Sequence, residues 1–445
     1  MATKKDLVEA QSFAKRRLTT AFVAGAPGGR EVEPHQPMKA IVAGLALAAV
    51  VVVGSLAFGW IKGSLPQDWG DNRLVIGKQS GARYVAIKDT LHPVINTTSA
   101  RLLIPADQFQ VITVDDDKLA AKKRGATIGI LGAPDSLTPP ASLSNTGWIA
   151  CTGGDGAVGV AVGSSVAAPD AAGRAAVVTA GGQTWVVTGG MRYPVPVGQV
   201  SAVTIALALD RQAPRPVPAS WLNLFTVGPA LQPVRIDGLG RPLAGLPPGA
   251  SVGSVLVVGA GTQERRYLVN PAGDLEPLPP VAYAMYRLGS GSGATDVSVQ
   301  PAQISSLKVA AQQTTAPRWP QAVPEVMTEA PCAHLVAEAN QPATTRLSAA
   351  PGVTVPAAGA RAEVATGRGA LVRAVAAGTT DSGPVYAIDQ TATAYAIPGA
   401  SADLLARLGY RTTDVTAVPA AWVEFFHPGP RLDPAAAQTV VSAGS

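Results

Sequence analysis

The stretch TWVVTGGMRYPV at residues 184–195 carries the main evidence on the fold. An aromatic residue is followed by a short apolar run, a Gly-Gly turn and a second apolar run near a proline, which is typical of a β-hairpin. The same pattern occurs in RYVAIKDTLHPV (83–94), RYLVNPAGDLEPL (266–278) and VYAIDQTATAYAI (385–397). The sequence therefore predicts four hairpins, each beginning near one aromatic residue: Tyr84, Trp185, Tyr267 and Tyr386.

Two similar five-residue segments indicate that part of the chain is duplicated. VPASW ends at Trp221 and VPAAW ends at Trp422, and these tryptophans are 201 residues apart, as are Trp185 and Tyr386. Two independent landmarks with one offset indicate a repeated unit rather than chance composition. Short helical stretches follow two of the hairpins, at 281–288 and 401–410. We expect Trp221 and Trp422 to turn inward, and the four hairpin aromatics to fill the cores of their modules.

The apolar runs 174–181, 253–262 and 368–376 read as strands of a central β domain. The predicted fold is therefore α+β and mostly β, with four hairpin/helix repeat modules around a central β domain and approximate two-fold internal symmetry. The predicted boundaries are 1–37 (cytoplasmic helix and linker), 38–62 (transmembrane helix), 63–140, 181–235, 263–325 and 381–445 (the four modules, the last with the C-terminal tail), and 141–180, 236–262 and 326–380 (central segments).

Composition and charge bound the function. The chain has 445 residues, of which 47% are hydrophobic and 15% charged, with 47 Gly and 38 Pro. So much Gly and Pro favours short strands and turns over long helices. The first 62 residues carry eight Lys/Arg and four Asp/Glu, which leaves a net charge of only +1 on the remainder. A nearly neutral body argues against nucleic acid as a partner, because phosphate binding needs a basic surface.

Residues 40–61, AIVAGLALAAVVVVGSLAFGWI, contain no charge and lie between Lys39 and Lys62. A helix of this length spans a hydrocarbon core of about 30 Å, and Trp60 suits the membrane interface. A signal peptide fits poorly, since the apolar run is too long and a long polar segment precedes it; a buried core helix is the other alternative. The positive-inside rule places the N-terminus in the cytoplasm and the body outside the cell membrane.

The N-terminal segment from Thr3 to Val23 has apolar residues at three- and four-residue spacing, and Thr3 with Asp6 resembles a capping box. Two interpretations stay open: an amphipathic helix on the membrane surface, and a docking helix for partner subunits.

Cys151 and Cys332 are the only cysteines, and the predicted topology places both outside the cytoplasm. An even count in an oxidising compartment favours a structural disulfide. A catalytic cysteine would need a histidine partner, and a zinc site would need more ligands at close spacing.

A search for catalytic, cofactor or metal sites yields none. The P-loop pattern G-x-x-x-x-G-K-[ST] is absent, and GDGAVG (154–159) leads into a strand rather than a helix. DDD (115–117) lacks the remaining ligands of a calcium loop and reads as a solvated turn, and GSGSG (289–293) reads as a flexible loop. The four histidines are scattered along the chain without metal-ligand spacing.

Several segments in order resemble the EccB family, a core membrane component of the type VII (ESX) secretion machinery of actinobacteria. They are AKRRLTTAF (14–22), the apolar helix, RYVAIKDTLHPVINTTSARLL (83–103), RGATIGILGAPDSL (124–137), WIAC (148–151), RGALVRAV (368–375) and WVEFFHPGPRLDPAAA (422–437). The resemblance implies a structural, single-pass membrane subunit with an elongated extracytoplasmic body of four modules and a Cys151–Cys332 disulfide. It also implies other ESX membrane components as partners, and a homodimer formed through the body.

Two alternatives come from other classes of function. The first is an extracytoplasmic ATPase or hydrolase, because ATPase activity is ascribed to the family, and ATP would then be the only cofactor. The second is a cell-wall-binding module, because aromatic repeats can stack on sugars.

Overall fold

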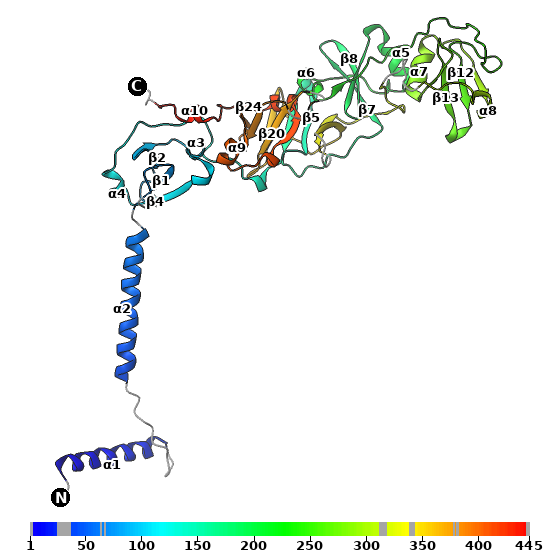
Figure 1. Ribbon diagram of the computed structural model, residues 1–445. Coiled ribbons are helices and arrows are strands. Elements are labelled where there is room, and N and C mark those ends of the chain that lie inside the picture. The colour runs from blue at the N-terminus through cyan, green and yellow to red at the C-terminus, as the bar shows by residue number, and fades with distance from the viewer. Residues whose placement is uncertain are drawn as a thin grey trace. The chain divides into compact units, whose positions relative to one another are not determined.

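The computed structural model describes residues 3–24, 37–62, 65, 68–310, 318–337, 343–376, 379 and 382–441, and among these it leaves out the side chains of 24, 37, 56–62 and 155. The chain divides into two compact units, Met1–Ser64 and Leu65–Ser445 (Figure 1).

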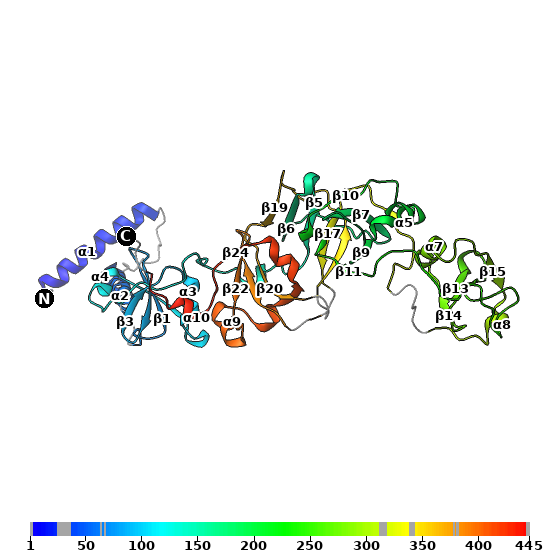
Figure 2. The ribbon, with the colours of Figure 1, turned by 90° about the horizontal axis from the view of Figure 1, so that it is seen from above.

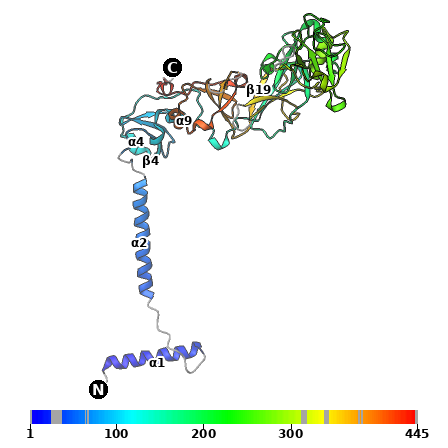
Figure 3. The same ribbon diagram turned by 45° about the vertical axis from the view of Figure 1, so that its right-hand side comes forward.

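The first unit contains two helices, α1 (Lys4–Ala24) and α2 (Pro37–Lys62) (Figure 3). The backbone N–H and the hydroxyl of Thr3 both donate to the Asp6 carboxylate, at 2.9 and 2.7 Å, which caps α1 as the sequence predicts. In α2, the window Met38–Ser55 is long and apolar enough to cross a membrane, and none of it is buried within the protein. An apolar helix that no other described residue covers is what a membrane span requires.

The second unit begins with a four-stranded sheet of order β3-β2-β1-β4. Its first three strands form an antiparallel meander, and β4 lies parallel to β1. A helix, α3, connects β3 to β4, and the Asn96 side chain caps it by accepting from Ser99 N at 2.8 Å. The bounds are β1 Arg73–Gly77, β2 Arg83–Ile87, β3 Thr90–Pro93, α3 Thr97–Leu103, β4 Gln110–Val114 and, after the sheet, α4 Asp116–Ala120.

Three other sheets follow the same plan: an antiparallel meander, a helix, and a strand parallel to the first. Each sheet with its helix is called a module here, numbered in chain order. The second comprises β7 Arg174–Ala180, β8 Gln183–Thr188, β9 Met191–Val195, α5 Val200–Ala206 and β10 Arg215–Pro216; the third β12 Val255–Val258, β13 Arg265–Val269, β14 Leu275–Pro277, α7 Pro280–Leu288 and β15 Asp296–Val299; the fourth β20 Ala370–Val375, β21 Val385–Ile388, β22 Thr393–Ile397, α9 Ala402–Leu408 and β23 Thr416–Pro419.

The second and fourth modules carry one more strand each, β11 (Thr226–Val227) and β24 (His427–Pro428), parallel to the third strand of the meander. A helical turn precedes each of these strands and carries a tryptophan: α6 (Ala219–Leu222) and the 3-10 segment η7 (Ala420–Phe425). A two-residue strand, β16 (Glu325–Val326), also pairs with β7. The remaining short elements are α8 Pro301–Ile304, α10 Pro434–Ala437, η1 Ala106–Gln108, η2 Pro140–Ser142, η3 Gly154–Gly156, η4 Val197–Gln199, η5 Gly261–Gln263 and η6 Thr412–Asp414.

A fifth sheet joins segments far apart in the sequence, in the order β18-β17-β5-β6-β19. The antiparallel pair β5–β17 lies at its middle. Its strands are β5 Trp148–Thr152, β6 Val158–Val162, β17 Cys332–Val336, β18 Thr344–Ser348 and β19 Ala360–Val364. This sheet is called the central sheet below.

The structure corrects the predicted membership of the central domain. The runs 174–181, 253–262 and 368–376 are not in the central sheet, because they form β7, β12 and β20, the first strands of three modules. Each module therefore begins one strand earlier than the boundaries 181, 263 and 381 imply. Each of these strands has a neighbour on both sides within its own sheet. An apolar run therefore identifies an inner strand without saying to which sheet it belongs.

Three buried clusters connect the parts of the second unit. One cluster joins the central sheet to the second and fourth modules, another joins the second module to the third, and another joins the first to the fourth. Figure 2 shows the last of these contacts, where α3 of the first module lies beside α9 of the fourth. The central sheet is thus held by residues that come from two different modules.

Candidate functional site

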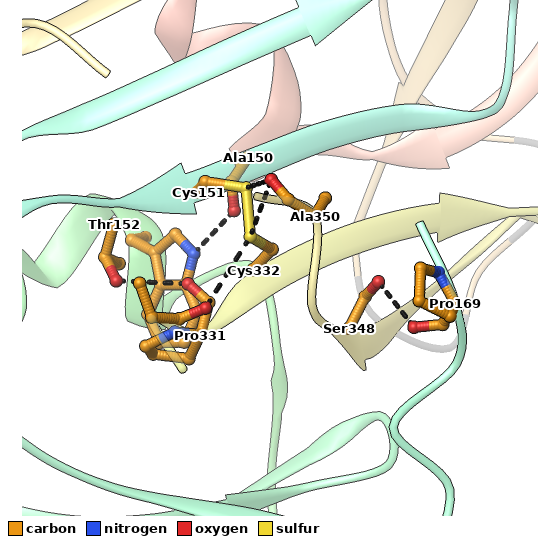
Figure 4. Close-up of a disulfide and its surroundings, with 10 residues drawn as sticks. Ala150, Cys151, Thr152, Pro169, Pro331, Cys332, Ser348 and Ala350 are labelled. Atoms are coloured by element: carbon orange, nitrogen blue, oxygen red, sulfur yellow. Dashed lines mark hydrogen bonds between the residues drawn. A yellow bond between two sulfur atoms is a disulfide. The ribbon is translucent and has the colours of Figure 1, made fainter. Parts of the chain in front are cut away.

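A disulfide in the central sheet joins Cys151 on β5 to Cys332 on β17 (Figure 4). The two residues are direct partners in the antiparallel register, with their Cα atoms 4.0 Å apart and a sequence separation of 181. Thr152 extends the pairing by one residue, since its backbone N–H and its hydroxyl both donate to the Pro331 carbonyl. The bond therefore joins the N-terminal half of the second unit, which holds the first two modules, to the C-terminal half, which holds the other two, at a point where strands of the two halves already pair.

A hollow of about 150 Å³ opens beside this disulfide, between both cysteines, Glu329 and Val355. Small-molecule sites usually measure roughly 300–1,000 Å³. The hollow is therefore too small for a drug-sized substrate.

Trp221 and Trp422 are both fully buried, and each donates its indole N–H to the central sheet. Trp221 Nε1 lies 2.9 Å from the Ala150 carbonyl oxygen on β5, and Trp422 Nε1 lies 2.9 Å from Thr345 Oγ1 on β18. The two similar segments VPASW and VPAAW therefore each place a tryptophan at a contact between a module and the central sheet. Buried indole N–H groups need such partners, because an unsatisfied donor costs free energy.

Sequence reasoning missed two residues that join β5 and the segment before it to the fourth module. Trp148 on β5 packs edge-on against Trp422, with ring centroids 6.1 Å apart, and against Phe426 at 5.3 Å. Asn145 donates to Asp414 O at 2.8 Å and accepts from Leu371 N at 2.7 Å, which ties the start of β5 to the fourth module. Trp148 lies inside the motif WIAC, which is one of the segments that carry the family resemblance. Asn145 is a single asparagine in a loop and belongs to no motif.

The four hairpin aromatics all lie on the second strand of their modules. Tyr84 is buried in the core of the first module, and Tyr267 is half-buried against a small cluster in the third. Trp185 and Tyr386 pack against the core that their modules share with the central sheet. That Trp185 and Tyr386 each fill the core of a single module stays a prediction.

The Gly-rich segment GDGAVG connects β5 to β6 as a tight hairpin through the 3-10 turn Gly154–Gly156. A dinucleotide site would need this segment to open a helix, whose N-terminus faces the phosphates. The turn instead leads directly into the strand β6, as the sequence indicates.

The acidic run 115–117 is bonded to the β1–β2 turn. Asp116 accepts from Ser80 N at 2.7 Å and from Ser80 Oγ at 2.9 Å, and Gln79 Nε2 donates to Asp115. Within the part of the chain that the structure describes, no group of three His, Cys, Asp or Glu side chains is placed to hold a metal ion.

The segment GSGSG (289–293) corrects another expectation, because it is a packed turn rather than a flexible loop. Gly291 lies against the Tyr286 ring, and a Cβ at Gly289 would meet the Val234 carbonyl at 1.9 Å. Ser290 N donates to that carbonyl at 2.9 Å. Gly289 and Gly291 are therefore required by close packing, whereas no atom lies within 4 Å of the Cβ position of Gly293.

An ion pair borders the disulfide. Arg174 at the start of β7 donates to the Glu329 carboxylate, and this contact lowers the pKa of Glu329 from 4.5 to about 2. Arg215 donates to the neighbouring Thr328 carbonyl. The segment that leads into β17 is thus held against the second module by two arginines, although the half-exposed Glu329 pair contributes at most about 1 kcal/mol.

The residues predicted to flank the membrane lie on α2. Lys39 is exposed near the beginning of the helix. Trp60 and Lys62 lie at its other end, and their side chains fall outside the described residues.

These features define a class of protein with an apolar N-terminal helix and a disulfide-bridged body of small β-sheets. The family model described as "Type VII secretion system ESX-1, transport TM domain B" matches residues 1–443. The chain therefore belongs to the EccB family of type VII secretion membrane components.

Curated relatives extend this result. The chain is 29% identical over 439 residues to the ESX-3 secretion system ATPase EccB3 of Mycolicibacterium smegmatis, covering 88% of this chain and 82% of the relative. It is 26% identical over 299 residues to the ESX-5 secretion system ATPase EccB5 of Mycobacterium tuberculosis, covering 63% of this chain and 58% of the relative. The chain thus spans less than two thirds of the length of EccB5.

Solved structures give the fold. An EccB3 dimer from the ESX-3 core complex matches with a TM-score of 0.68 and 25% identity, covering 82% of this chain and 99% of that one. A chain of an intact ESX-5 inner membrane complex matches with a TM-score of 0.67 and 23% identity, covering 100% and 96%. The mixed, mostly β architecture is therefore that of this family.

Proposed function

We propose that this chain is a structural, single-pass subunit of a type VII secretion complex in the cell membrane. Its N-terminus lies in the cytoplasm, and its body lies on the opposite side. The observation that carries the proposal is the family match over residues 1–443. The exposed apolar helix α2 and the basic segment before it support the orientation.

Its partners are the other membrane components of such a complex and a second copy of this chain. Support comes from the similar chains, one of which was solved within an ESX-5 inner membrane complex and another as a dimer. In this role the second unit acts as a scaffold, because its largest buried cluster joins the central sheet to two modules. Nucleic acid is not a partner, since the body is nearly neutral.

Extraction of the affinity-tagged chain from membranes tests this function. We expect the mild-detergent eluate to contain other membrane proteins and two or more copies of the chain, in a particle far heavier than the chain's 45.1 kDa. An unrelated single-pass protein with the same tag serves as the control. A monomer recovered alone, under conditions that keep other membrane complexes intact, would contradict the proposal.

A structural role does not require ATP turnover, although the curated relatives carry the word ATPase in their names. The segment that comes nearest to a nucleotide motif is the β5–β6 hairpin, and it lacks the helix that such a motif needs. ATP hydrolysis by the purified chain that disappears in Gly154→Ala/Gly156→Ala, without loss of folding, would support the alternative of an extracytoplasmic ATPase.

We further propose that the modules are repeats, with the second and fourth as the nearest pair. Gly228 and Gly429 are 201 residues apart, and a Cβ at either would approach a tyrosine ring to 2.5 Å, Tyr193 and Tyr395 respectively. Leu231 N donates to Pro194 O at 2.9 Å, and Leu432 N donates to Ala396 O at 2.8 Å. The glycines and leucines are 201 residues apart, and the residues that they contact are 202 apart. Equivalent contacts at nearly one offset are what a duplication predicts.

Approximate two-fold symmetry is proposed for the same region, with its axis near the disulfide. Ser144, which precedes β5, donates to Gly369 O of the fourth module at 2.8 Å. Glu325, which precedes β17, donates to Gly173 O of the second module at 2.8 Å. The segment before β5 therefore bonds to the fourth module, and the segment before β17 bonds to the second module, so each half of the second unit contacts a module of the other half. Cys151 and Cys332 meet where the halves cross.

The repeat proposal predicts equal effects from equivalent substitutions. Gly228→Ala and Gly429→Ala should each lower the free energy of unfolding by about 1–3 kcal/mol, because the added methyl overpacks a tyrosine ring. Gly198→Ala is the control, since no atom lies within 4 Å of its Cβ position. Urea unfolding followed by far-ultraviolet circular dichroism measures all three. A loss at one position with none at the other would contradict the equivalence.

A further inference from the structure

We propose that the first module binds anionic phospholipid headgroups through its basic edge, defined as residues Lys122–Arg124. The inference rests on the proposed membrane insertion of α2. It goes beyond that function, because it gives part of the body a lipid ligand.

The covalent chain limits how far the first module can lie from the end of α2. The helix ends at Lys62, and Leu65 packs against the core of the first module with Trp69. Three residue steps span at most about 11 Å. The headgroup layer adds about 5–7 Å to each side of the hydrocarbon core. Leu65 therefore stays within reach of the headgroups, whatever angle the module adopts.

The basic edge is fixed next to these two residues. Lys122 Nζ lies 4.7 Å from the centroid of the Trp69 ring, a cation–π contact. The backbone of the edge pairs with β3, since Leu91 N donates to Lys123 O at 2.9 Å and Gly125 N donates to Leu91 O at 3.0 Å. The cations are therefore held on the same side of the module as the aromatic residue that follows the membrane helix.

The charges on this edge remain available to a ligand. Lys123 and Arg124 are exposed, and among the described residues neither is within ion-pair distance of a carboxylate. Two acids near Trp69 in the sequence have partners elsewhere: Asp68 pairs with Arg73 at 2.6 Å, and Asp71 accepts from Lys88 N at 3.2 Å. Exposed cations within about a Debye length of an anionic surface are attracted to it, and a tryptophan suits the same depth.

Photocrosslinking of the full chain in lipid nanodiscs tests this inference. A benzophenone amino acid replaces the exposed Ala121, beside the edge, or as a control the exposed Ala302 on α8. The discs contain phosphatidylcholine alone or with phosphatidylglycerol. We expect the lipid adduct at position 121 to rise severalfold with phosphatidylglycerol. Lys123→Gln/Arg124→Gln should return it to the level in phosphatidylcholine, whereas Lys308→Gln/Arg361→Gln, a charge-matched change elsewhere, should not.

The outcomes separate this inference from the proposed function. Suppose that the chain enters the discs. If the adduct yields are then equal in both lipids, or if Lys123→Gln/Arg124→Gln leaves them unchanged, the headgroup site is overturned and membrane insertion still stands. A chain that does not enter the discs would overturn both. A competition experiment adds inorganic phosphate, or sodium chloride of equal ionic strength. If phosphate abolishes the increase caused by phosphatidylglycerol and sodium chloride does not, the basic edge binds free phosphate and the lipid assignment is overturned.

Discussion

Replacement of Trp422 by alanine is expected to lower the free energy of unfolding of the second unit by about 3–5 kcal/mol. The substitution removes a contact between η7 and the central sheet, where the ring is fully buried and packs edge-on against Trp148. It also removes the donor to Thr345 Oγ1, a buried hydroxyl that would lose this partner. The midpoint of urea unfolding, followed by far-ultraviolet circular dichroism of the full chain in detergent, measures the effect.

Two variants sharpen this experiment. Trp422→Phe should lose less, because it keeps an aromatic ring against Trp148 and removes only the hydrogen bond and part of the volume. Glu424→Ala, an exposed residue of the same turn, should stay within about 0.5 kcal/mol of the parent. If Trp422→Ala and Glu424→Ala shift the midpoint equally, the contact between η7 and the central sheet does not stabilise the fold.

Removal of the disulfide by Cys151→Ala/Cys332→Ala is the second large change. A bond that closes a loop of 181 residues stabilises a fold by about 5 kcal/mol in the chain-entropy model, because it restricts the unfolded chain. The strands β5 and β17 remain paired through their backbone, so the folded variant should keep its circular dichroism spectrum and unfold at lower urea.

Reductant supplies the matching control. Dithiothreitol should lower the unfolding midpoint of the parent toward that of the double variant, and should leave the double variant unchanged. If the double variant has the same unfolding midpoint as the parent, and dithiothreitol leaves the midpoint of the parent unchanged, the bond does not contribute to stability.

The sequence was most informative where a residue type has one dominant physical use. The uncharged run 40–61 predicted α2, and the two words VPASW and VPAAW predicted two short helical turns whose tryptophans face inward. The pair Cys151 and Cys332 predicted the disulfide. Each of these signals can be read from residue type and spacing alone, without knowledge of the rest of the fold.

Membership of the sheets was beyond the sequence, because it depends on pairing between distant segments. The strands β7, β12 and β20 are apolar on both faces, as a central strand would be, but they belong to the modules. The central sheet uses strands such as CAHLV and TTRLS, which lie within the predicted central segment 326–380 but whose polar residues give no clear strand pattern. Asn145 acts through bonds to residues more than 200 positions away, which no local pattern records.

The crossing of the two halves has a consequence for biogenesis. Asn145 meets its partner Asp414 only after 269 further residues have been synthesised. At about 5–20 residues per second, that interval lasts roughly 13–54 seconds. During it, the apolar ring of Trp148 lacks Trp422 and Phe426, against which it packs in the finished fold. A nascent chain that stops before the fourth module would present this ring to proteases and chaperones, so synthesis of the fourth module decides whether the core around β5 is completed.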